Sequence, residues 1–301
     1  MNKQTRIRPR TRCLRFYSAT LLRTTFCLTL PWAISLHIIA RQAAPPARDT
    51  DSPFASAEVL RYSVRWSFVR LGSIELRQKP ASNAAGAFAL VTLSARSASG
   101  LPFIDVHVRD RSVLDASDPR CRDFTVRKEH EPASVKKYTY DRNSRTLAME
   151  ITEAGQPSVR RQRVEQRDFY DALGVIMLLR GLAGSGERIT IPMLMDFEIV
   201  HSKACCPREI DDISVSAFDD DVPAHRITLR SSWEDESVGG LGGDIDLWCS
   251  ADAAAIPLRA EMELTLGSIV IELESCTRSG WSRRSIAGSG DSAGPVKGGA
   301  R

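Results

Sequence analysis

Alternation of apolar and polar residues is the feature that most limits what this chain folds into. Over residues 60–68, the sequence LRYSVRWSF places an apolar side chain at every second position and a polar one between them. Successive side chains of a β-strand point to opposite faces, so this pattern predicts a strand with one buried and one solvated face. The same period recurs over residues 104–109, 189–199 and 261–266. Pro192 indicates that the strand over 189–199 begins late or lies at a sheet edge.

Shorter strands and turns fill the rest of the pattern. Short strands are indicated near residues 87–95, 122–130, 135–140, 145–152, 225–230 and 244–249. Residues typical of turns occur at 83–86, 115–119, 141–144, 153–157 and 239–243. Ten or more strands with few helices predict a mainly β fold, with antiparallel pairing in a curved sheet, a sandwich or a partly open barrel. A parallel α/β fold is excluded. The glycine cluster GGLGGD opens a strand, whereas a phosphate-binding loop leads into a helix.

One segment, DFYDALGVIMLLRG at residues 168–181, predicts a helix. Asp168 is suited to cap its start and Asp171 to lie near the positive end of the helix dipole. Arg180 lies in the last turn, and Gly181 provides a left-handed stop. Apolar residues cover nearly the whole circumference between them, so we expect a helix that is buried on more than one side. Two placements remain open: inside a β shell, or across one open end of the sheet.

The N-terminal segment has the pattern of an export signal. Six arginines lie between Arg6 and Arg23, the apolar run FCLTLPWAISLHIIA follows at residues 26–40, and small residues and prolines come next at 43–47. The run is about fifteen residues long and contains a proline and a histidine, which is short of the roughly 20 residues that span a bilayer. We therefore expect a cleaved signal over residues 1–43 rather than a signal anchor. If uncleaved, this segment would be the chain's membrane contact.

The net charge of +4 comes from this leader. Of the 41 Lys and Arg residues, nine lie in the first 50 positions, together with one of the 37 Asp and Glu residues. The remainder carries 32 basic and 36 acidic residues, a net charge of −4. Nucleic-acid binding requires clustered Lys and Arg that displace counterions from phosphates. The mixed and mildly acidic body therefore argues against a nucleic acid as a partner.

Five cysteines follow the leader: Cys121, Cys205, Cys206, Cys249 and Cys276. In an oxidising compartment they are disulfide candidates, although five cannot all pair. Cys205 and Cys206 would form a strained ring if joined to each other, so each is expected to meet a distant partner. His201 lies four residues before Cys205. Because no second pair of Cys or His stands at ligand spacing, we predict no metal site and no cofactor.

Few polar residues are arranged for binding or catalysis. Asp105, His107 and Arg109 would share one strand face, either as a ligand-facing patch or, as we favour, as a solvated face with cross-strand ion pairs. Trp66 and Trp248 are candidates for lining an apolar or sugar pocket, with core packing as the favoured role of Trp66. No G-x-S-x-G, H-E-x-x-H or cysteine-protease motif occurs, so we do not predict an enzyme.

Four segments together resemble a known family: RYSVRWSFVRLGSIEL at residues 61–76, YDRNSRT at 140–146, DFYDALGVIMLLRGL at 168–182 and DIDLWCSADAAAIPLRAEMELTLGSIVIEL at 244–273. Their order is similar to that of the bacterial domain-of-unknown-function family DUF3108, and the resemblance covers most of residues 58–276. It implies an exported, β-rich protein. The family brings no established reaction, so no catalytic positions carry over. The Cys205–Cys206 segment and the long basic leader depart from its pattern.

These observations predict four regions of the chain and a general role. The regions are an export signal or anchor (1–43), a linker (44–57), one β-rich domain (58–277) and a disordered tail rich in Gly and Ser (278–301). We expect a periplasmic or envelope protein that binds, without catalysis, a lipid, a glycan or a partner protein. The alternatives are a structural or assembly protein, and an enzyme whose site is assembled from residues distant in sequence.

Overall fold

The part of the chain that the structure describes consists of one large sheet and one helix. The computed structural model describes residues 53–83, 86–101, 105–128, 134–153, 156, 158–195, 197–231, 244–263, 267–279 and 281. The strands before the helix are β1 (Glu58–Trp66), β2 (Val69–Asn83), β3 (Gly86–Ser97), β4 (His107–Asp115), β5 (Cys121–Lys128), β6 (Ser134–Asp141), β7 (Thr146–Glu153) and β8 (Val159–Val164). The helix is α1 (Ala172–Leu182). The strands after it are β9 (Glu187–Met195), β10 (Glu198–Cys206), β11 (Asp211–Ile213), β12 (Val222–Ser231), β13 (Ile245–Ser250), β14 (Pro257–Glu263) and β15 (Ser268–Arg278).

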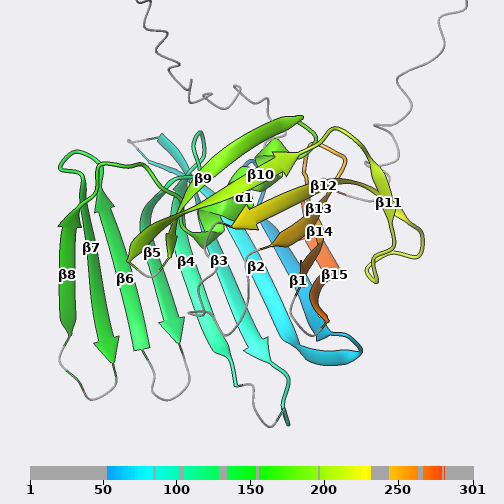
Figure 1. Ribbon diagram of the computed structural model, residues 1–301, viewed down its shortest axis with the longest axis horizontal. Coiled ribbons are helices and arrows are strands. Elements are labelled where there is room, and N and C mark those ends of the chain that lie inside the picture. Colours follow the sequence, from blue (N-terminus) through cyan, green and yellow to red (C-terminus); the bar gives the residue numbers. More distant parts are fainter. Residues whose placement is uncertain are drawn as a thin grey trace, which may run out of the picture. The chain divides into compact units, whose positions relative to one another are not determined.

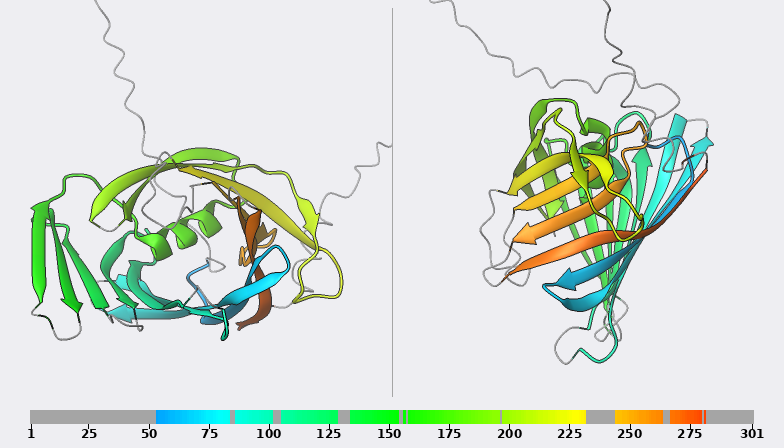
Figure 2. Two further views of the ribbon diagram at one scale, coloured as in Figure 1. Left: turned by 60° about the horizontal axis from the view of Figure 1, so that its bottom comes forward. Right: turned by 90° about the vertical axis from the view of Figure 1, so that its right-hand side faces the viewer.

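All 15 described strands belong to one antiparallel sheet (Figure 1). Its order is β8-β7-β6-β5-β4-β3-β2-β1-β15-β14-β13-β12-β10-β9, and β11 pairs with β12 beside this path. The first and last strands therefore lie together in the middle of the sheet, where Leu60 is opposite Cys276. The sheet curves strongly, but its edge strands β8 and β9 do not pair with each other (Figure 2). The predicted mainly β, antiparallel, curved fold is confirmed, and the sheet is not a closed barrel.

The strand predicted over residues 189–199 is two strands. The chain turns after Met195, so that β9 and β10 form a hairpin in which Ile199 is opposite Leu194. Apolar residues occupy odd-numbered positions both before and after the turn, so the sequence pattern looks like that of one uninterrupted strand. Pro192 lies in the edge strand β9, as its missing amide hydrogen predicted.

Side chains join the two edges of the sheet where backbone pairing does not. Arg163 in β8 contacts two residues at the turn of the β9–β10 hairpin. Its guanidinium lies 4.9 Å from the ring centroid of Phe197, and its Nη1 is 3.3 Å from a carboxylate oxygen of Glu198. A cation–π contact of this kind and a partly exposed ion pair each contribute about 1 kcal/mol or less. These side-chain contacts between the two edge strands are therefore weak compared with the backbone hydrogen bonding between paired strands of the sheet.

Helix α1 lies inside the curve of the sheet, between the strands β3 and β4 and the arch formed by β9 and β10 (Figure 2). The structure therefore selects the first of the two predicted placements, a helix within a β shell. Leu173 and Met177 are almost fully buried in one core cluster, and Val175 and Leu179 belong to a second one. The all-round apolar surface of the helix is explained by these contacts with several strands.

Both ends of the helix differ from the predicted ones. Asp171, not Asp168, is the N-cap, and its side chain accepts a hydrogen bond of 2.9 Å from the amide of Gly174. Asp168 instead forms an ion pair of 2.8 Å with Arg145, which removes it from the helix start. At the other end the helix continues through Gly181 to Leu182, and the left-handed residue is Gly184, with φ of 68°.

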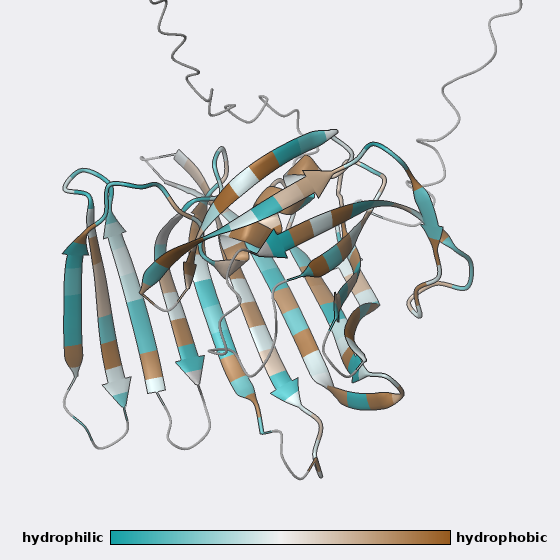
Figure 3. Ribbon diagram, viewed as in Figure 1, coloured by the Kyte–Doolittle hydropathy of each residue, from teal (hydrophilic) through white to brown (hydrophobic). Residues whose placement is uncertain are grey.

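The apolar face of each predicted strand forms the interior. Figure 3 shows hydrophobic and hydrophilic residues alternating along the strands. On β1, the inward positions Leu60 and Tyr62 are buried, whereas Arg61 between them is exposed. Leu114 on β4 and Leu273 on β15 are fully buried in the same core. The alternation read from the sequence therefore identifies the inner face correctly.

The folded region extends beyond the bounds predicted from the sequence. Phe54, in the predicted linker, is buried in the core. Trp281, in the predicted tail, makes an edge contact with Phe218 and donates a hydrogen bond of 2.6 Å to Asp252. The leader and the glycine cluster at 239–243 lie outside the described residues. Among the described residues, no helix, α1 included, has the length and apolar composition needed to cross a membrane.

Candidate functional site

The interior is not completely filled by side chains. A cavity of about 300 Å³ lies between α1 and the inner face of the sheet, with lining residues from strands β1, β2, β3, β9 and β12 to β15. Most of these side chains are aliphatic; examples are Ile74, Leu93, Met193, Leu247, Ile269 and Ile271. Close packing normally leaves few voids larger than a water molecule in a protein interior, so a cavity of this size distinguishes the site.

One side of α1 forms a wall of the cavity. Ala172, Val175, Ile176 and Leu179 line it, and their spacing of three and four residues places them on one helical face. On the opposite wall, Ala260 and its neighbours come from β14, which faces the helix across the empty space. The small side chains of Ala172 and Ala260 help to leave this space open.

The polar residues that line the cavity bind one another or the backbone. Tyr62 donates a hydrogen bond of 3.1 Å to the carbonyl oxygen of Pro257. Burial raises the pKa of Tyr62 well above its usual value, so it stays a neutral phenol. Arg259 and Glu261 form an ion pair. A site with so few available polar partners is poorly suited to ordered water and well suited to hydrocarbon.

A polar cluster that the sequence reading missed lies at the N-terminus of α1. Ser112 donates a hydrogen bond to the buried carboxylate of Asp171, and Oδ1 of Asp110 is buried with no hydrogen-bond partner among the described residues. Burial raises the pKa of both carboxyl groups to about 6, and the charge of Asp171 adds to the effect on Asp110. Asp110 is opposite Leu93, which lines the cavity. One sequence feature could have revealed this cluster. Polar residues occupy positions 110 and 112, where the alternating pattern of the strand predicts inward-facing apolar side chains.

The predicted trio Asp105, His107 and Arg109 lies away from the cavity. On β4, Ser112 is buried and Arg109 is exposed, so His107 and Arg109 belong to the outer face of the strand. Asp105 precedes the strand and is exposed. Arg109 lines a separate hollow of about 450 Å³ on that outer face. The structure therefore does not bring this trio to the interior site.

The two predicted tryptophans lie on opposite faces of the sheet. Trp66 is opposite Ile269 across the β1–β15 pair, and Ile269 lines the cavity, which places Trp66 at the cavity rim. It is 40% exposed, so core packing does not fully account for it. Trp248 lies on the face away from the cavity, where it is partly buried against core residues and the guanidinium of Arg226 stands 5.4 Å from its ring centroid. Only Trp66 remains a candidate for contact with a ligand in the cavity.

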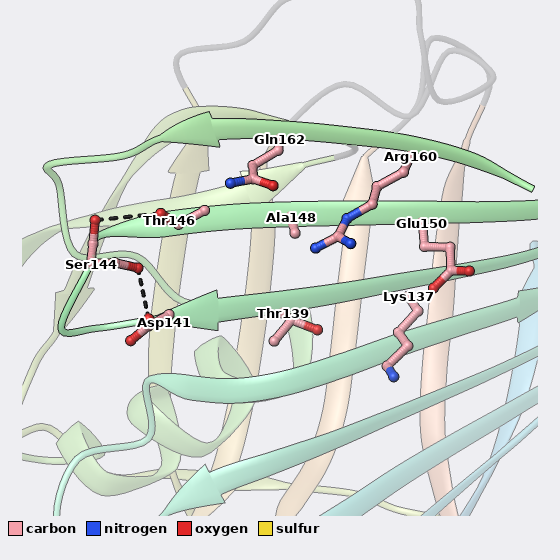
Figure 4. A pocket seen from close by; sticks show the side chains of 9 residues that line it. All are labelled: Lys137, Thr139, Asp141, Ser144, Thr146, Ala148, Glu150, Arg160 and Gln162. Carbon is pink, nitrogen blue, oxygen red and sulfur yellow. Dashed lines mark hydrogen bonds between the residues drawn. The ribbon is translucent and has the colours of Figure 1, made fainter.

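A second surface hollow, of about 500 Å³, lies over β6, β7 and β8 (Figure 4). Its lining is polar. The lining residues lie on the outer face of these strands, whereas residues that alternate with them, such as Tyr138 and Met149, are buried on the inner face. Ser144 donates a hydrogen bond of 2.7 Å to Asp141 within it. Such short local bonds are typical of a solvated turn and strand face, and they leave the apolar cavity as the stronger candidate site.

The cysteines do not form a disulfide or a metal centre within the described residues. Cys205, Cys206, Cys249 and Cys276 are free thiols, and the side chain of Cys121 lies outside the description. Cys206 and Cys249 lie in β10 and β13 with β12 between them, and β14 separates Cys249 from Cys276 in the same way. Two strand spacings are about 9.5 Å, more than the roughly 7 Å that a disulfide spans. No cluster of three or more His, Cys, Asp or Glu suited to a metal ion occurs in this part of the chain.

A comparison with family models agrees with the family suggested by the sequence, and comparisons with solved structures and curated proteins are reported beside it. The structure is similar to a β-barrel-like protein of domain of unknown function DUF1849 from Brucella abortus, with a TM-score of 0.49 and 9% identity, covering 74% of this chain and 97% of that one. No curated protein matches the chain. The model of the family "Protein of unknown function (DUF3108)" matches residues 61–274, which is more than half of the sequence. The chain therefore belongs to the DUF3108 family.

Proposed function

We propose that this protein binds, without catalysis, the apolar chain of a lipid in the cavity beneath α1. The observation that carries the proposal is the cavity itself, with its aliphatic lining and its volume of about 300 Å³. This volume is at the lower end of the range of ~300–1,000 Å³ for ligand pockets and about twice the ~150 Å³ of a cavity that holds benzene. Each methylene group buried there would contribute about 0.8 kcal/mol.

The chemistry of the lining favours a lipid over a glycan. A sugar requires several directed hydrogen-bond partners, but Tyr62 already donates to Pro257, and Arg259 and Glu261 bind each other. Catalysis is not part of the proposal, because the lining offers no nucleophile and base within reach of each other among the described residues.

Binding of an apolar fluorescent probe, phenylnaphthylamine, to the full chain tests the proposal. We expect its fluorescence to rise on binding and an alkanol of about ten carbons to displace it. Ala260→Phe places a ring in the cavity and should abolish most of the signal, because Ala260 lines the site. Ala87→Phe, at an exposed position of β3, is the matched control and should bind normally. Equal binding by both variants, or none by the unmodified chain, would reject the proposal.

We further propose that the protein acts in the bacterial envelope after export. The support is the order of basic, apolar and small residues in the first 47 positions. Mass spectrometry of the protein isolated from its own cells tests this. A mature chain that begins after Ala40 or Ala43, found in the envelope fraction, is the expected result. A full-length chain in the cytoplasm would refute it.

A further inference from the structure

The tip of the β1–β2 hairpin exposes two aromatic side chains. Phe68 is 93% exposed and Trp66 is 40% exposed, the first of these being the most exposed large hydrophobic residue among those described. Between them, Ser67 has a φ of 52°, so the turn is tight and holds the two rings at the end of the hairpin. A phenyl ring left in water forgoes about 1.5–3 kcal/mol of burial energy, which contact with an apolar surface would recover.

This tip is continuous with the lipid cavity. Trp66 and Val64 on β1 are opposite Ile269 and Ile271 on β15, and both isoleucines line the cavity. Directly opposed residues in an antiparallel pair lie on the same face of the sheet. The apolar inner face therefore runs from the cavity to Trp66, two residues before Phe68 in the turn.

Cationic side chains lie on the outer face of the same strands, and Arg70 on β2 is the one nearest to the tip. The hollow of about 450 Å³ over β1 to β4 and β15 is lined by four arginines and two glutamates: Arg61, Arg70, Arg96, Arg109, Glu75 and Glu274. Arg61 binds Glu75 and Arg70 binds Glu274, at 2.9 and 2.7 Å. The lining of this hollow therefore holds two more arginines than glutamates, and the long side chain of Arg96 is exposed. This charge matches the phosphates of an anionic lipid surface.

From these features we propose that the β1–β2 hairpin docks on an anionic lipid bilayer, with Trp66 and Phe68 at the acyl boundary and the neighbouring arginines against phosphate headgroups. The inference rests on the proposed lipid-binding function, because it assigns the tip as the route by which a lipid chain reaches the cavity. Aromatic rings are favoured at the membrane interface, where one edge meets hydrocarbon and the other meets water. Each arginine near an anionic surface adds about 1 kcal/mol, so tip and charges reinforce each other.

A local fluorescence measurement on the full chain tests the docking. The basic leader would also hold the chain on vesicles, so a readout confined to the tip is required. We would introduce Phe68→Trp and, as the matched control, Ile210→Trp, at another exposed apolar position. Vesicles of phosphatidylglycerol and brominated phosphatidylcholine should quench most of the emission that Phe68→Trp adds and little of that added by Ile210→Trp. Arg96→Gln in the Phe68→Trp background should reduce the quenching.

The results separate the docking from lipid binding itself. If phenylnaphthylamine binds in the cavity but the two added tryptophans are quenched equally, the docking is refuted and the lipid-binding function stands. If the tip is quenched but the probe does not bind, docking stands and the proposed cavity function fails. Equal quenching together with a dimer in native mass spectrometry would assign the tip to a second copy of the chain and overturn the membrane proposal.

Discussion

The guanidinium of Arg180 and the carboxylate of Glu58 form an ion pair with both side chains completely buried. Nη2 of Arg180 is 3.1 Å from Oε2 of Glu58, and the same guanidinium donates to the carbonyl oxygens of Ala254 and Ala255 at 3.0 and 3.1 Å. Arg278 approaches Oε2 of Glu58 at 2.6 Å from the other side. This network joins the helix to the first and last strands of the sheet.

Replacing Arg180 should therefore cost more stability than its position in an apolar helix suggests. Arg180→Met leaves Glu58 buried with one cation fewer, and removal of one partner of a buried pair typically costs about 3–5 kcal/mol. Urea unfolding followed by circular dichroism measures the change. Arg61→Met, which breaks an exposed pair, should cost no more than about 1 kcal/mol. Similar losses in the two variants would show that the Arg180 pair is hydrated in solution.

The carboxyl group of Asp171 should make stability fall as the pH rises from about 4 to about 7. Its pKa in the folded protein is about 6, against 3.8 without burial. Folding therefore favours its protonated form, and the benefit is complete below pH 4 and is lost as the pH passes 6. Two pKa units correspond to about 3 kcal/mol. Asp171→Asn keeps an acceptor for the amide of Gly174 and should flatten this part of the profile, as urea unfolding at several pH values would show.

The control for this experiment is Asp141→Asn. Hydrogen bonds from Ser144 and Asn143 lower the pKa of Asp141, so its contribution changes only below the pH window of interest. We expect the slope between pH 4 and 7 to be unchanged in this variant. If Asp171→Asn also left the slope unchanged, the carboxyl group would be ionised and hydrated in the folded protein.

Filling the cavity should not destabilise the fold. An added ring in a well-packed core typically costs about 1–3 kcal/mol, because neighbouring side chains must move. Ala260 faces the cavity, so the ring of Ala260→Phe has space available. Ala224 is fully buried in the core cluster, and Ala224→Phe should show the normal penalty. Thermal unfolding of both variants tests this, and equal penalties would mean that the cavity closes in solution.

The buried thiols should resist alkylation in the folded chain. Burial raises the pKa of Cys206 and of Cys249 to about 12, so the reactive thiolate is scarce at pH 8. Cys205, its side chain on the opposite face of β10, is only half-buried. Iodoacetamide labelling followed by peptide mass spectrometry should modify Cys205 first, while all thiols react in denaturant. Rapid labelling of Cys249 would contradict the packing of β13 against the core.

Local patterns were sufficient to predict the strands and their inner faces. The alternation of Leu60, Arg61 and Tyr62 matches their burial, because each side chain needs only to be inside or outside, although farther along β1 Ser63 is buried and Trp66 is exposed. Turn chemistry was equally local: Asp141 accepts hydrogen bonds from Asn143 and Ser144 between β6 and β7, as its residue type suggests. The exact start of the helix could not be predicted from the local sequence. Asp168 and Asp171 are both suitable caps, and the choice depends on Arg145, which is distant in sequence.

The candidate site could not be read from the sequence for a related reason. Ala260, Ile269 and Leu93 each look like ordinary strand residues, and the cavity exists only because their strands face one side of α1 across a gap. Volume left empty is a property of the whole assembly and has no signature in any one segment. Trp66 was identified as a candidate because an aromatic residue near a strand end is visible in the sequence, whereas its neighbour across the β1–β15 pair is not.

The pairing of β1 with β15 in the middle of the sheet has a consequence for how the chain reaches this structure. Leu60 meets Cys276, so the central ladder forms only after nearly the whole domain has left the ribosome. Contacts between distant parts of a chain slow folding, because loop closure costs entropy before the contacts compensate. During synthesis, β1 to β8 can pair in sequence order, but the edge of β1 that β15 occupies in the native sheet stays unsatisfied. The order of the strands therefore delays completion of the native sheet until synthesis is nearly finished, and until then leaves the edge of β1 open to a chaperone or to another chain.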